Sequence, residues 1–125
     1  MNNFIVVGLG GAIGSAFRHA VNIGSARLLG VGFPYGTFVV NVAGSLAMGI
    51  LAGYFAFRGE TQQAWRLFLA TGILGGFTTF SAFSLDVALL YERGQLWLAL
   101  TYAVGSVVLS ILSLFVGLSI VRQFT

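Results

Sequence analysis

The sequence predicts an all-α membrane protein with four transmembrane helices, the third of them broken. Of its 125 residues, 58% are hydrophobic and 7% are charged, whereas roughly a quarter of the residues in a soluble domain are charged. The charges delimit four uncharged stretches, each able to supply the roughly 20 residues that cross a bilayer as a helix. Because backbone in lipid must satisfy its own hydrogen bonds, and the alternation of a membrane barrel is absent, we expect helices.

We expect a single transmembrane domain, residues 1–125, with helices over approximately residues 3–29, 35–57, 66–91 and 95–122. The first helix starts near the N-terminus, because MNNFIVV lacks the basic segment of a secretory signal peptide. It ends before Gly30, Gly32 and Pro34, which break a helix. The next loop is expected over Arg58–Arg66.

The third stretch carries residues that weaken a helix in mid-membrane. Gly75 and Gly76 are adjacent, and hydroxyl residues follow at Thr78, Thr79 and Ser81. Paired glycines destabilise a helical turn and hydroxyls compete for its backbone partners, so we expect an unwound turn at the glycine pair. Such a turn must be buried in protein or line a cavity, where its carbonyls could hold a small cation. A kinked packing helix is the alternative.

The basic residues give little information on orientation. They divide almost evenly between the two sides: Arg58, Arg66 and Arg122 on the side of the termini, Arg27 and Arg93 on the other, with Arg18 joining the second group if it ends the first helix. The positive-inside rule needs a bias. Either one weakly specified orientation exists, or copies insert both ways (dual topology) and pair as an antiparallel homodimer.

Small residues recur at four-residue intervals, which lets helix backbones approach closely in lipid. The rows are Gly8–Ala12–Ala16–Ala20, Gly10–Gly14, Ser45–Gly49–Gly53 and Gly72–Gly76. We interpret them as helix-packing surfaces.

Several polar and aromatic residues lie inside the predicted spans. Asn41, in the second, could form an interhelical hydrogen bond or donate to a passing anion. Phe77, Phe80 and Phe83 share a face, which indicates packing or, alternatively, ring edges turned toward an anion. One face of the fourth span carries a polar stripe, which either packs or donates to an ion: Tyr102, Ser106, Ser110, Ser113 and Gly117.

Composition argues against other function classes. There is no Cys, one His and no cluster of basic residues, which leaves no basis for a zinc site or nucleic-acid binding. Asp86 and Glu92 lie near span ends, so a proton-coupled exchanger lacks an embedded acid. No set of nucleophile, base and orienting residue can be assembled, so we do not expect an enzyme.

Three motifs resemble the Fluc fluoride channels, also called the CrcB family, over nearly the whole chain. They are GGAIGSAFRH from Gly10, GTFVVNVAGSLAMG from Gly36 and GILGGFTTFSAFSLD from Gly72. The resemblance implies a fluoride-selective passive channel in the bacterial inner membrane. It also implies an antiparallel dimer with two pores and a structural Na⁺ at its centre.

The resemblance also implies roles for individual residues. Backbone carbonyls of Gly75 and Thr78 from both subunits would hold the Na⁺, and Arg18 would lie at the aqueous vestibule. Phe80 and Phe83, from different subunits, would turn ring edges toward the ion. The residues assigned to the fluoride path are Asn41, Phe80, Phe83, Ser81, Thr37, Ser106, Ser110 and Tyr102.

The chain departs from the family pattern at three positions. Ala82 stands where members often carry Thr or Ser, His19 replaces a common Tyr, and Asp86 a common Glu. The first departure removes one hydroxyl from the expected polar path. Two other functions fit parts of the sequence: a small dual-topology multidrug exporter, which the lack of a Glu in the first span disfavours, and a membrane assembly subunit that transports nothing.

Overall fold

The computed structural model describes residues 2–56 and 62–124, and the secondary structure in these ranges is helical. The helices are α1 (Asn3–Leu29), α2 (Tyr35–Phe55), α3 (Gln63–Arg66), the π-helix η2 (Leu67–Leu74), α4 (Gly75–Phe77), α5 (Ser81–Glu92) and α6 (Leu96–Gln123). The first part of the expected second loop, with Arg58 and Glu60, and the expected helix end at residue 57 lie outside the described residues. The last part of that loop is helical instead, because the third span begins at Gln63 and not at residue 66.

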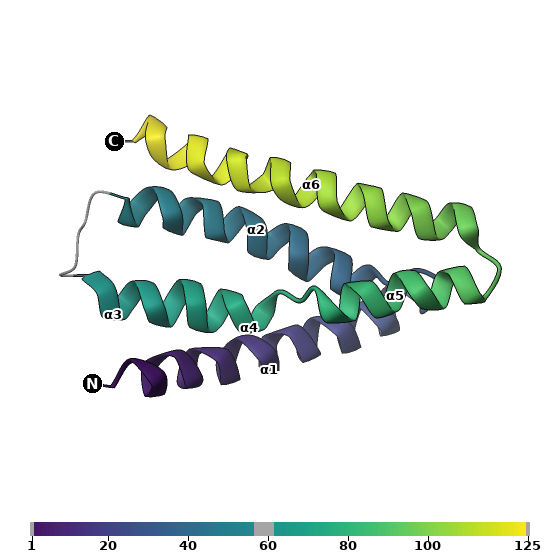
Figure 1. The fold of residues 1–125 in the computed structure, drawn as a ribbon, viewed down its shortest axis with the longest axis horizontal. Coiled ribbons are helices and arrows are strands. Elements are labelled where there is room, and N and C mark those ends of the chain that lie inside the picture. The colour runs from purple at the N-terminus through teal and green to yellow at the C-terminus, as the bar shows by residue number, and fades with distance from the viewer. Residues whose placement is uncertain (1, 57–61, 125) are drawn as a thin grey trace.

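Four spans are long and apolar enough to cross a membrane: Asn3–Leu29, Tyr35–Phe55, Gln63–Glu92 and Leu96–Gln123. They lie side by side, with both ends of the chain at the same end of the bundle and a short non-helical stretch between α4 and α5 (Figure 1). The predicted fold of four apolar helices with a broken third is confirmed. The antiparallel dimer stays a prediction.

The connections form where the sequence places residues that end a helix. Asn2 caps α1 by accepting a hydrogen bond from Phe4 N at 2.7 Å. Gly30, at φ 86°, ends α1, and Gly94, at φ 80°, lies between α5 and α6. Both φ values lie in the left-handed region that glycine adopts without steric cost, which explains glycine at these two turns.

Glycine contacts join the spans in two pairs. A Cβ atom at Gly76 would lie 2.6 Å from Gly11 O, and one at Gly10 would lie 2.9 Å from Gly72 Cα. On the opposite side of the bundle, α2 and α6 meet through Gly49 against Leu114. These rows pack as predicted, because a side chain at any of these positions would overlap backbone.

One of the predicted rows does not pack within the chain. A Cβ atom at Gly8 would meet nothing within 4 Å, and Ala12, Ala16 and Ala20 are exposed. Within the described part of the protomer nothing covers this row, and its packing against another helix stays a prediction. A four-residue spacing fixes which residues share a face, but not what covers that face.

The break lies later in the third span than expected. Gly75 and Gly76 remain helical, and the chain becomes extended at Thr78, with φ −87° and ψ 160°. The helix resumes at Ser81. Gly76 packs against Gly11 of α1, which holds this turn in helical geometry, and the chain leaves the helix only at the hydroxyl residues that follow. Residues 67–74 form a π-helix that the sequence did not predict.

Arg18 lies inside α1 and is half-buried, rather than at the end of a helix. The side opposite the termini therefore keeps Arg27 and Arg93 as its basic residues, against Arg66 and Arg122 among the described residues of the other side. This distribution leaves the charge bias weak.

Candidate functional site

A groove of about 260 Å³, with polar and aromatic side chains in its wall, opens where the break in the third span faces α2 and α6. It contains five of the residues predicted for the fluoride path: Asn41, Phe80, Phe83, Ser106 and Ser110. Ser45, Thr78 and Thr79 also line it, together with apolar residues of α6. The groove brings together one residue set from three different spans.

Asn41 is bound to the broken segment through both ends of its amide. Its Nδ2 donates to Thr79 O at 3.0 Å, and its Oδ1 accepts from Thr79 N at 2.8 Å. This pairing replaces the two helical hydrogen bonds that the break removes from the Thr79 peptide. The expected interhelical hydrogen bond therefore exists. An amide nitrogen carries two hydrogens, so the second hydrogen of Nδ2 is not used in this pairing and can donate to another acceptor.

The hydroxyls around the break hydrogen-bond to its backbone, and that of Thr79 replaces a helical partner that the break removes. Thr78 Oγ1 donates to Leu74 O at 2.9 Å. Thr79 Oγ1 accepts from Ala82 N at 3.1 Å and so caps the start of α5. Ser84 Oγ donates to Phe80 O at 3.0 Å. The break is thus stabilised locally by the same hydroxyls that the sequence indicated as its cause.

Two carbonyls at the break keep their acceptor capacity. In a continuous helix Gly75 O would accept from Thr79 N, but that donor goes to Asn41. The N–H that would serve Thr78 O, that of Ala82, goes to Thr79 Oγ1. Within the described chain neither carbonyl accepts a hydrogen bond. Hard cations such as Na⁺ prefer oxygen ligands, so these two carbonyl oxygens fit the ion that the resemblance implies.

Two phenylalanines form the aromatic wall of the groove and differ in burial. Phe83 is 8% exposed, whereas Phe80 is 76% exposed. Their ring centroids are 5.7 Å apart at 48°. Phe83 also packs on Tyr102, with centroids 5.2 Å apart. Within one protomer Phe83 belongs to the core, while the ring of Phe80 lies on the surface of the protomer.

Ser106 is a buried polar residue with unused hydrogen-bonding capacity. It is 3% exposed and lines the groove. Its Oγ makes no hydrogen bond to any part of the chain that the structure describes. A buried hydroxyl without a partner is costly and calls for an explanation. Ser110, one turn further along α6, is half-buried on the same wall.

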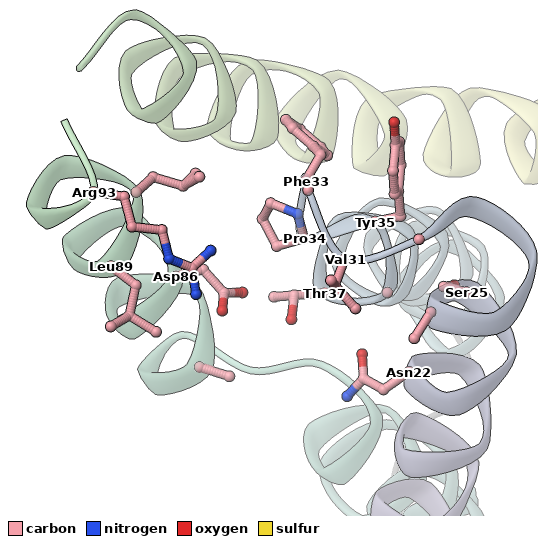
Figure 2. A pocket seen from close by; sticks show the side chains of 16 residues that line it. Asn22, Ser25, Val31, Phe33, Pro34, Tyr35, Thr37, Asp86, Leu89 and Arg93 are labelled. Carbon is pink, nitrogen blue, oxygen red and sulfur yellow. The ribbon is translucent and has the colours of Figure 1, made fainter. Parts of the chain in front are cut away.

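The remaining predicted path residues lie outside the groove. Thr37 lines a second cavity of about 310 Å³, which Asp86 and Arg93 also border, with Asn22 and Ser25 opposite (Figure 2). Ala82 faces this cavity and not the groove.

Tyr102 is 1% exposed, and its hydroxyl donates to Asp86 Oδ2 at 3.0 Å. The packed rings of Phe83 and Tyr102 therefore lie between the groove and the second cavity. Ser81 is exposed and lies 3.3 Å from Thr79 Oγ1 through its hydroxyl.

The predicted vestibule residue is tied to the break. Arg18 Nε donates to Gly76 O at 3.1 Å, in a partly buried environment. Sequence reasoning also missed two groove residues, Ser45 and Thr79, as lining groups. Ser45 lies four residues after Asn41 and so on the same helix face, a spacing that could have indicated it.

Comparison with known proteins identifies relatives over nearly the full length. The family model "CrcB-like protein, Camphor Resistance (CrcB)" matches residues 5–118. The "Fluoride-specific ion channel FluC 2" of Nitrobacter hamburgensis is 59% identical over 98% of this chain and 99% of its own length. The corresponding figures for the "Fluoride-specific ion channel FluC" of Rhodopseudomonas palustris (strain BisB5) are 60%, 98% and 98%. The channel of the same name from Caulobacter vibrioides is 48% identical over 98% of both chains. The chain therefore belongs to the CrcB family of fluoride-specific ion channels.

Proposed function

We propose that this protein is a fluoride-specific ion channel of a bacterial inner membrane, through which cytoplasmic fluoride leaves down its electrochemical gradient. The observation that carries the proposal is the groove, where neutral hydrogen-bond donors from three spans meet two phenylalanine rings. A passive channel of this kind confers fluoride resistance without an energy source. Its family consists of ion channels, so the protein is not an enzyme.

The groove can replace the hydration shell of a small anion. Transfer of a bare ion into a dry interior costs many kcal/mol unless other dipoles solvate it. Ser106 Oγ has no hydrogen-bond partner among the described residues, so its hydroxyl can donate to an anion. Asn41 can donate its second amide hydrogen, and the edges of the phenylalanine rings are electropositive. None of these groups is charged. They therefore bind the ion weakly enough to release it, which conduction requires.

The two ends of the break have opposite polarity. The helix that ends at Phe77 directs its carbonyls, the negative end of its dipole, into the break. The N-terminus of α5, the positive end, starts at Ser81 beside the groove. A cation is favoured at the first and an anion at the second, which suits a central Na⁺ close to a fluoride path.

The complete channel is an antiparallel homodimer with two pores. Phe80 is 76% exposed beside the groove, so its ring is available to line a path together with Phe83 of a second copy. The weak charge bias of Arg27 and Arg93 against Arg66 and Arg122 favours insertion in both orientations. The Gly75 and Thr78 carbonyls of both copies would meet at the two-fold axis and hold a structural Na⁺ there, which would offset repulsion between anions.

An exporter of cationic drugs would need a titrating acid in its transport path. Among the described residues that line the groove there is no Asp or Glu. The nearest candidate, Asp86, lies in the second cavity and accepts the Tyr102 hydroxyl. The structure therefore favours the channel over this alternative.

The test is efflux from liposomes that contain the purified protein, recorded with a fluoride electrode and compared with chloride. We expect fast, voltage-driven efflux of fluoride and none of chloride. Efflux of both ions at similar rates would contradict the proposal. Proton-dependent uptake of an organic cation would instead support the exporter.

The two phenylalanines should be separable by experiment. Phe80→Ile should slow fluoride efflux by about two orders of magnitude without changing protomer stability, because Phe80 is 76% exposed. Phe83→Ile should slow efflux and also lower the melting temperature, because Phe83 is in the core. Unchanged efflux in both variants would remove the rings from the mechanism.

A further inference from the structure

The carbonyl of Gly76 lies at the end of the helix that precedes the break. In a continuous helix it would accept from Phe80 N. Phe80 lies beyond the extended residue Thr78, so this bond is absent. Arg18 Nε takes the place of the missing donor at 3.1 Å. A side chain from α1 thus satisfies a carbonyl that the break leaves unpaired.

Glycine packing places Arg18 within reach of this carbonyl. A Cβ atom at Gly14, one turn before Arg18, would lie 2.8 Å from Phe77 N. Gly76 itself packs against Gly11, because a Cβ atom at Gly76 would lie 2.6 Å from Gly11 O. The two backbones are therefore almost in contact, and the arginine spans a short gap at a partly buried position.

The bond has properties that suit a positioning role. It joins an ionised donor to a carbonyl, which makes it stronger than a neutral hydrogen bond. Nε is fixed in the plane of the guanidinium, so the bond also sets the direction of the group.

We propose that Arg18 is a positioning residue that fixes the Gly76 peptide, and through it the orientation of the flanking Gly75 and Thr78 carbonyls toward a bound Na⁺. The inference rests on the proposed function, which places the Na⁺ at those carbonyls. It differs from a vestibule role, in which the positive charge of Arg18 attracts anions. Arg18→Lys separates the two roles, because lysine keeps the charge and loses the Nε donor.

The first measurement needs no ion flux. Hydrogen–deuterium exchange of the detergent-purified protein in Na⁺ follows the amides of residues 74–81 in wild type and in Arg18→Lys. The matched control is Arg27→Lys, since Arg27 is an exposed arginine of the same helix. We expect exchange in 74–81 to become several-fold faster in Arg18→Lys, with α2 and α6 unchanged, and no change in the control.

The second measurement is the Na⁺ dependence of fluoride efflux from liposomes, with N-methylglucamine replacing Na⁺. The half-saturating Na⁺ concentration should rise about tenfold in Arg18→Lys and stay at the wild-type value in Arg27→Lys. A tenfold change corresponds to about 1.4 kcal/mol, near the lower limit for a hydrogen bond to a charged group.

Three results would overturn the inference. Wild-type exchange and Na⁺ dependence in Arg18→Lys would make Arg18 a vestibule charge. Equal effects in both lysine variants would indicate a general effect of arginine loss. Faster exchange in all four spans would mean that Arg18 supports the whole fold. Absence of fluoride efflux from wild-type liposomes would instead contradict the proposed function, while exchange would still test the contact.

Discussion

The two faces of the third span use their polar backbone in opposite ways. Toward α1, Gly72 and Gly76 bring backbone against backbone, with distances below 3 Å for a Cβ atom at either position. Toward α2 and α6, Thr78 and Thr79 of the break line a groove of about 260 Å³, together with Ser106, whose hydroxyl has no partner among the described residues. The first face has no spare volume, and the second has spare hydrogen-bonding capacity. The comparison teaches that a closely packed wall can hold an incompletely paired segment in place.

The largest expected effect is on the packed face. Gly14→Ala should lower the free energy of unfolding by about 3 kcal/mol, because the new methyl group would overlap the Ile73 carbonyl and approach Phe77 N to 2.8 Å. Backbone atoms cannot move aside as a flexible side chain can. The measurement is thermal or denaturant unfolding in detergent.

The matched control carries the same substitution on the same helix. Gly8→Ala adds a methyl group where nothing lies within 4 Å, and alanine is the better helix former. Its stability should equal or slightly exceed that of wild type. If both variants lost stability equally, the packed face would not be the cause.

The next effect concerns the two hydrogen bonds that join Asn41 of α2 to Thr79 at the break. Asn41→Ala removes both hydrogen bonds to Thr79, at 3.0 and 2.8 Å, and leaves a partly buried N–H and C=O without partners. We expect a loss of about 2 kcal/mol in unfolding free energy, together with faster amide exchange at residues 78–81. Ser45→Ala, one turn further along α2 and also in the groove, should leave stability and exchange unchanged. Equal amide exchange in both variants would contradict the claim that the hydrogen bonds of Asn41 stabilise the break.

Hydropathy and helix breakers predicted most of the fold, because a lipid solvent leaves few alternatives to long apolar helices. The position of the break was predicted a few residues early. Gly75 and Gly76 have weak local helix propensity, but the contact of Gly76 with Gly11 of α1 keeps this turn helical. The competing partner of Thr79 is Asn41, from a different span. Such a partner cannot be read from local pattern, and neither can the π-helix of residues 67–74.

The site was predicted in part. Residue type and the family resemblance indicated five residues that the groove brings together. Thr37 and Tyr102 are instead separated from it, because Tyr102 packs on Phe83 and binds Asp86. Helical spacing predicts that residues share a face, whereas the depth at which each one meets another span depends on packing. The dimer and the Na⁺ need a second copy and an ion, so they remain predictions.

The smallest expected effect tests the groove face directly. Ser106 Oγ has no hydrogen-bond partner among the described residues, so Ser106→Ala removes no internal bond and should change unfolding free energy by less than about 0.5 kcal/mol. If the hydroxyl solvates fluoride, efflux should fall roughly 2- to 10-fold, the range for one neutral hydrogen bond. Ser113→Ala, on the same helix but outside the groove, should leave efflux unchanged. A Ser106→Ala channel that is less stable but equally fast would show that the hydroxyl serves the assembly. The unpaired hydroxyl of Ser106 would then not serve to bind an ion.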